Sequence, residues 1–244
     1  MALAIGLSIC AFFTAVLSGV VGMGGGAALL AVMLLATDLE PAAVVAVHAV
    51  VQLVANGSRA LLLLKHVRWR PFLLMALPAL PMPAVGMLIV KHARAETLEL
   101  AMGAAILYAA WAPRWGVQRL PEWLAFGIAG VLGGALGVVV GAIGPITAPF
   151  FLRTDFDRHQ IVATKAVCAC YFHILKIVAF GVALAGFSYG DHVGIAAPMA
   201  LACVLGSWVG KKILGRLSEK AFRVVFKTVL TVLAVRIIVL ALWG

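Results

Sequence analysis

Acidic side chains are scarce in this chain, and none lies near the middle of an apolar segment. The 244 residues include 9 Asp and Glu against 19 Lys and Arg, and the nine acids lie in loops or at the ends of apolar runs. Pumps and cation transporters usually place carboxylates within the membrane. The sequence therefore disfavours cation transport. If protons move with a substrate, histidine is the expected carrier.

Cysteine is also sparse. Cys10, Cys168, Cys170 and Cys203 lie in apolar segments without CxxC spacing, which disfavours disulfides and a metal site. A membrane-embedded enzyme acting on an anionic lipid stays an alternative, but it needs a nucleophile or a metal set. Cys168 and His173 are only loosely placed for that role. We expect no catalytic residue, no bound metal and no cofactor.

Charge of either sign is too rare for a soluble protein of this length. The chain is 64% hydrophobic and 11% charged, with a mean hydropathy of +1.13. Such a composition is typical of an integral membrane protein. The net charge of +10 gathers in short loops, which indicates topology and contact with anionic lipid rather than nucleic-acid binding. The lipid bilayer is thus an expected partner and nucleic acid is not.

The apolar residues fall into about eight segments, so we predict an all-α membrane fold. A crossing helix needs about 20 residues. The segments are 1–36, 41–64, 72–90, 96–112, 122–152, 159–186, 192–214 and 220–243. The first and fifth exceed that length and are interrupted by G-M-G-G-G and G-A-I-G-P. Glycine and proline break helices, so each is predicted to be a long helix, a break and a short half-helix.

The breaks occupy equivalent places in two repeats. Gly22 aligns with Gly141, and the halves 1–113 and 122–244 are joined by a linker at 114–121. Basic residues mark 65–70 and 211–223 as cytoplasmic loops, whereas 186–192, the counterpart of 65–70, has no Lys or Arg. Opposite charge bias at equivalent loops is typical of inverted repeats. We therefore predict two repeats of opposite orientation.

A polar stripe follows each break. In the segment 41–64, His48, Gln52, Asn56 and Arg59 share one narrow helix face. Residues 45–59 align without a gap with 162–176, which puts Lys165, His173 and Lys176 opposite His48, Asn56 and Arg59. Cations within membrane segments are costly and are functional candidates by default. The repeated pattern predicts a two-sided anion site.

Each residue of the stripes also has a structural interpretation. Arg59 and Lys165 could extend to the membrane surface, and Asn56 and His173 could hydrogen-bond between helices. A backbone carbonyl could satisfy His48. The glycines at 130, 133, 134, 137 and 141 could serve close helix packing. Recurrence in register favours a shared site over these separate explanations.

The glycine breaks supply the other half of the predicted site. A half-helix that begins after a glycine turn leaves free N–H groups and partial positive charge at its N-terminus, which anions bind. His48 and His173 are the candidates for proton coupling. The expected substrate-binding residues are Gly24, Gly25, Gly26, Gln52, Asn56, Arg59, Gly144, Thr147, Lys165, His173 and Lys176.

These residues resemble a known family. The break G-M-G-G-G, its repeat G-A-I-G-P, and the helices H-A-V-V-Q-L-V-A-N-G-S-R and A-T-K-A-V-C-A-C-Y-F-H-I-L-K are similar to the TauE/SafE, or sulfite exporter, family over essentially the whole chain. The resemblance implies a multi-pass inner-membrane protein that moves sulfite or organosulfonate anions, often outward. Family members commonly carry a proline in the first half-helix, where this chain has Ala31-Val32.

The leading hypothesis is a secondary transporter, most simply an exporter, of a small sulfur-containing anion, located in the cell membrane and, for a bacterium, the inner membrane. A passive anion channel lined by the same residues is the alternative. A purely structural role would leave the buried cations unexplained. The expected partners are a small anion and the bilayer, and a homodimer is an open alternative for assembly.

Overall fold

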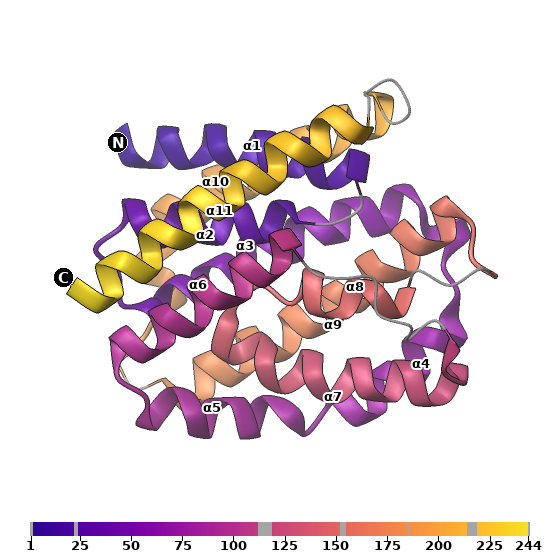
Figure 1. Ribbon diagram of the computed structural model, residues 1–244, viewed down its shortest axis with the longest axis horizontal. Coiled ribbons are helices and arrows are strands. Elements are labelled where there is room, and N and C mark those ends of the chain that lie inside the picture. The colour runs from indigo at the N-terminus through magenta and orange to yellow at the C-terminus, as the bar shows by residue number, and fades with distance from the viewer. Residues whose placement is uncertain are drawn as a thin grey trace.

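Every regular element in the described part of the computed structural model is helical (Figure 1). The described residues are 2–21, 24–111, 119–151, 155–184, 186–213 and 219–243. The α-helices are α1 (Ala2–Val21), α2 (Gly25–Ala36), α3 (Pro41–Leu62), α4 (Trp69–Ala79), α5 (Met82–His92), α6 (Ala95–Trp111), α7 (Glu122–Val140), α8 (Gly144–Phe151), α9 (Arg158–Ala183), α10 (Val193–Ile213) and α11 (Glu219–Trp243). Two short 3-10 helices are η1 (Leu64–His66) and η3 (Tyr189–His192). Gly22, Met23 and most of the predicted linker 114–121 lie outside the described residues.

The helices follow the predicted apolar segments to within a few residues, with one difference. The segment predicted as a single helix at 72–90 consists of α4 and α5, which are bent by 48° at their junction. Pro78 lies inside α4 and Pro81 caps α5. Proline lacks an N–H and its ring crowds the preceding turn, so these two residues explain the bend.

Length and hydropathy support fewer membrane crossings than the sequence suggested. Among the described residues, four helices are long and apolar enough to cross a membrane, or five if α4 and α5 form one span. The four are α3, α7, most of α9, and α10 with η3. Half-helices such as α2 and α8 are too short to cross. The structure is thus an all-helical membrane architecture, and eight crossings are not confirmed.

The chain reverses at both glycine clusters. Gly24 has φ of 94° and Gly141 has φ of 72°, values that L side chains rarely adopt. Gly24 separates α1 from α2, and Gly141 separates α7 from α8. A Cβ on Gly141 would also meet Leu30 and Val45. Glycine at 141 is therefore required by both backbone angle and space.

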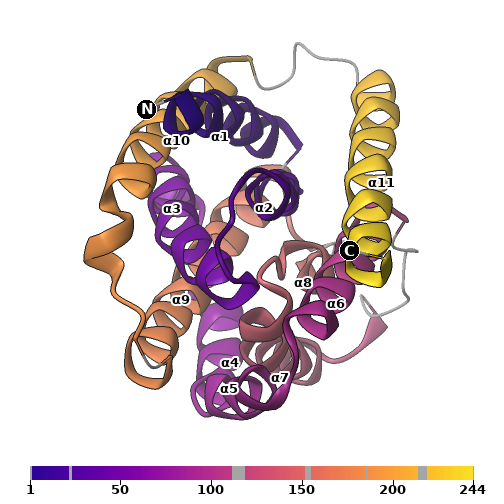
Figure 2. The same cartoon turned by 90° about the vertical axis from the view of Figure 1, so that its left-hand side faces the viewer.

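Helices from one half of the chain pack on helices from the other (Figure 2). α1 lies against α10, while α7 lies against α4 and α5. α3 packs on α9 near the centre, and α6 packs on α11 at one side. Each half therefore completes its packing only against the other.

Two of the helix pairs that join the halves are antiparallel, α3 with α9 and α6 with α11. At one end of the α3–α9 pair, the His66 and His159 rings lie 5.0 Å apart, and deeper along it His48 faces His173 at 6.3 Å. Sequence numbers rise on one helix as they fall on the other, so the pair is antiparallel. α6 and α11 are antiparallel too, because Trp111 Nε1 donates to Thr231 whereas Gly103 meets Ile238.

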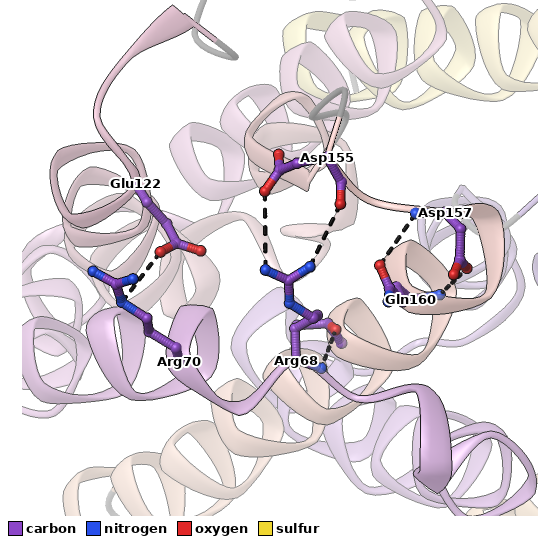
Figure 3. Close-up of polar contacts among 7 residues, drawn as sticks. Arg68, Arg70, Glu122, Asp155, Asp157 and Gln160 are labelled. Atoms are coloured by element: carbon purple, nitrogen blue, oxygen red, sulfur yellow. Dashed lines mark hydrogen bonds and ion pairs between the residues drawn. The ribbon is translucent and has the colours of Figure 1, made fainter.

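Polar contacts tie the segments together at one end of the molecule (Figure 3). Arg68 approaches the Asp155 carboxylate at 3.9 Å, and Arg70 approaches Glu122 at 3.3 Å. Asp157 caps α9 by accepting from the N–H of Gln160 at 2.9 Å. This hydrogen bond lowers the pKa of Asp157 because it stabilises the charged carboxylate. These contacts fix the start of α9 beside the start of α4.

Close packing through glycine gives a stability prediction. A Cβ on Gly134 of α7 would lie 2.7 Å from the Ala79 carbonyl oxygen, whereas a Cβ on Gly127 of the same helix would meet nothing within 4 Å. We expect Gly134→Val to destabilise the protein by about 1–3 kcal/mol, the usual cost of overpacking. Thermal unfolding in detergent, measured beside the matched control Gly127→Val, checks this. Equal melting temperatures for the two variants would contradict the packing described.

Candidate functional site

Both glycine breaks border one internal cavity, which also lies against α3 and α9. Its volume is about 60 Å³. Ten of the residues predicted to bind substrate or protons line it. They are Gly24, Gly26, His48, Gln52, Asn56, Arg59, Gly144, Thr147, Lys165 and His173. The fold thus brings the two breaks and both polar stripes together at one place.

The cavity has two buried cations at its wall and no acidic residue among its described lining. Arg59 and Lys165 are both buried at its wall, and none of the described residues that line it is Asp or Glu. Arg59 Nε has no hydrogen-bond partner among the described groups. A buried cation is costly unless an opposite charge or hydrogen bonds stabilise it. An anion in this cavity would provide both.

The polar stripe of α3 forms a chain of hydrogen bonds that orients Arg59. The Asn56 amide donates to the Gln52 carbonyl at 2.8 Å, and its Oδ1 accepts from Arg59 Nη1 at 3.1 Å. Asn56 therefore holds the guanidinium rather than reaching into another helix. This leaves the structural interpretation of Asn56 as interhelical glue without support in the described contacts.

The two predicted proton carriers face each other across the α3–α9 contact. His48 Nε2 lies 2.8 Å from the Gly26 carbonyl oxygen. A carbonyl only accepts, so Nε2 carries the hydrogen, and Nδ1 of a neutral His48 is then an acceptor. The Nδ1 atoms of His48 and His173 are buried without a partner among the described groups. The carbonyl contact of His48 therefore satisfies only one of its two nitrogens.

Lys176 holds the second break instead of lining the cavity. Its Nζ donates to the Gly141 carbonyl oxygen at 2.6 Å, and the residue is 1% exposed. Gly141 itself lines the cavity. His48 and Lys176 thus make matching contacts, since each joins the polar helix of its own half to a carbonyl of the break in that half. The sequence had suggested that Lys176 supplies charge to the substrate directly.

The half-helices present their N-termini at the cavity. Gly24, the N-cap of α2, has no side chain to cap that helix, and the first N–H groups of a helix lack intrahelical partners. Thr147 of α8 donates its hydroxyl to the Ile143 carbonyl at 3.1 Å. Gly25 does not line the cavity, because it faces Thr14 and Ser18 of α1. Of the predicted binding residues, Gly25 and Lys176 therefore lie behind the wall.

Other lining residues escaped sequence reasoning. Ser18 contributes from α1, and Phe151 and Phe172 contribute aromatic walls. Ser18 is one of three hydroxyl residues in the apolar helix α1, and phenylalanine is common throughout this chain, so neither carries a sequence signal. Gly141 did carry one, as part of the second break.

Comparison with known proteins identifies the family of this chain. A family model described as Sulfite exporter TauE/SafE matches residues 7–237, nearly the whole chain. The chain belongs to the TauE/SafE family. No curated protein and no solved structure gives a match.

Membership of the TauE/SafE family makes this a multi-pass membrane protein of the sulfite-exporter type. TauE/SafE proteins are transporters rather than enzymes. In the described part of the chain, no group of three or more His, Cys, Asp or Glu is placed to hold a metal ion.

Proposed function

We propose that the protein is a secondary transporter that binds a small sulfur oxyanion in the cavity between its glycine breaks. The observation that carries the proposal is the pairing of buried Arg59 and Lys165 with a cavity that has no acidic residue among its described lining. An oxyanion would accept from Arg59 Nε, the atom that has no hydrogen-bond partner among the described groups. Guanidinium groups match the geometry of oxyanions.

The size of the cavity favours sulfite over larger organosulfonates. About 10–15 Å³ of cavity volume holds one water molecule. The volume of about 60 Å³ would then hold roughly four to six heavy atoms. Sulfite fits within that limit, whereas sulfoacetate exceeds it. We therefore infer that sulfite is transported in preference to long-chain sulfonates.

Alternating access would follow from two repeats of opposite orientation. The antiparallel pairs α3–α9 and α6–α11 and the crosswise packing of α1 and α7 support halves at 1–113 and 122–244. A site between inverted repeats can open to either side as one repeat moves against the other. For a bacterial source, the membrane would be the inner one.

Proton coupling would use His48. Its Nδ1 can donate to a bound anion only when the imidazole is protonated, because Nε2 is committed to the Gly26 carbonyl. His48 is buried, and a positive charge at a buried position is costly unless an opposite charge stabilises it. A bound anion would stabilise it. Anion and proton would then move together.

The purified protein in liposomes tests this function. Uptake of radiolabelled sulfite would be compared with sulfate, thiosulfate, sulfoacetate and chloride, with and without a pH gradient. We expect saturable sulfite flux that sulfoacetate inhibits weakly. Flux no greater than in protein-free liposomes would contradict the proposal. Large single-opening currents would instead indicate the anion channel.

A further inference from the structure

A second cavity adjoins the first at the end of the molecule that carries the basic loop. It has a volume of about 230 Å³ and lies among the C-terminal ends of α3 and α10 and the start of α9. Its lining includes Arg59, Leu62, Leu63, His159, Ser207 and Lys211. Arg59 and Val162 line both cavities. The second cavity is large enough for roughly fifteen water molecules or more.

The second cavity is positively charged at both of its ends. Arg59 lies at the junction between the second cavity and the binding cavity. Lys211 lies at the exposed rim of the second cavity, with its Nζ 3.5 Å from the Leu62 carbonyl oxygen. Asp155 and Asp157 occupy the same end of the molecule but are not among its described lining residues. One sign of charge in a hollow with low-dielectric walls concentrates ions of the other sign.

The opposite end of the molecule lacks an equivalent opening at the matching positions. Arg59 and Leu63 of the first half align with Lys176 and Phe180 of the second. Arg59 and Leu63 each keep 9% exposure and line the second cavity, whereas Lys176 is 1% exposed and Phe180 is 0% exposed. Phe180 is packed in the apolar core with Val45 and Leu30. Among the described residues, these matching positions are therefore closed by side chains on the opposite side.

We propose that the second cavity is a hydrated basic vestibule. A small oxyanion would reach the binding cavity through this vestibule from the side of Lys65 and Arg68. Arg59 would contact the anion at the junction of the two cavities. The proposal rests on the proposed transport function. By the positive-inside rule, that side is cytoplasmic. Lys211 would attract the anion before it binds in the first cavity. A change at Lys211 would therefore alter the apparent KM for anion presented on the Lys211 face, but not the maximal rate of transport.

Sided flux measurements test the vestibule. Lys211→Glu and Lys211→Gln would be compared with wild type in inside-out and right-side-out vesicles, with radiolabelled sulfite as the probe. We expect Lys211→Glu to raise KM by roughly 5- to 10-fold for sulfite presented on the Lys211 face, with unchanged maximal flux and unchanged KM on the other face. The effect should shrink in about 0.5 M salt, because salt screens exposed charges. Lys211→Gln should give a smaller shift in the same direction.

Matched controls separate the possible failures. Lys91→Glu reverses an exposed charge at the end of α5 that lines neither cavity, and should leave KM on the Lys211 face unchanged. If Lys211→Glu shifts the KM equally on both faces, or does not shift it at all, the vestibule proposal is wrong. The transport function would still stand in that case, provided that the wild-type protein shows sulfite flux. Absence of wild-type flux would overturn the function itself. A shift seen only in vesicles containing phosphatidylglycerol, and absent in phosphatidylcholine, would assign the cavity to lipid headgroups instead.

Discussion

Replacing Arg59 with glutamine is expected to raise the KM for sulfite by roughly 10- to 150-fold. The change removes a charge-assisted hydrogen bond worth about 1.5–3 kcal/mol to a bound anion. Arg59 is buried at the junction of the two cavities, and its Nε has no partner among the described groups. Initial rates of sulfite uptake into proteoliposomes measure the effect. Arg59→Lys should recover part of the loss, since it restores charge without the planar fork.

The control for Arg59→Gln is Lys91→Gln, which removes an exposed cation at the end of α5. Its KM should equal that of wild type. Size-exclusion chromatography of both variants separates loss of binding from loss of folding. A folded Arg59→Gln protein with wild-type KM would remove Arg59 from the site.

Replacing His48 with glutamine is expected to abolish sulfite accumulation driven by a pH gradient while leaving sulfite exchange intact. Glutamine can still donate to the Gly26 carbonyl, as His48 Nε2 does at 2.8 Å, but it takes up no proton. If one proton moves with each anion, a gradient of about one pH unit supports up to about tenfold accumulation. The variant should accumulate none. Labelled sulfite inside and outside the vesicles gives the ratio directly.

His92→Gln is the matched control for His48→Gln. His92 is exposed at the end of α5, with Nδ1 2.8 Å from the Leu88 carbonyl oxygen, so it also contacts a backbone carbonyl but lines neither cavity. This variant should accumulate sulfite as wild type does. Gradient-driven accumulation that survives in His48→Gln would assign the proton to another group.

The sequence predicted the glycine breaks and most of the polar residues on the cavity wall because these depend on local chemistry. Backbone angles that only glycine tolerates, at Gly24 and Gly141, leave a signal in the chain. So does a stripe such as Gln52, Asn56 and Arg59, which recurs every three or four residues on an apolar helix.

Features that depend on distant partners were not predictable in the same way. The contact of Lys176 with the Gly141 carbonyl spans 35 residues, so the periodicity of α9 alone could not distinguish a lysine that holds a break from one that binds substrate. The vestibule is assembled from three helices around Arg59 and Lys211. The bend at Pro78 and Pro81 did have a local signal, and a stricter application of the proline rule would have found it.

Direct binding of sulfite to the purified protein tests the central claim, that the anion lies between the glycine breaks. Isothermal titration would compare wild type with Arg59→Gln/Lys165→Gln and with the surface control Lys91→Gln/Arg94→Gln. We expect one sulfite per chain in wild type and in the control, and an affinity weakened by at least roughly 100-fold in the cavity variant. Equal affinity in the two double variants would contradict the claim.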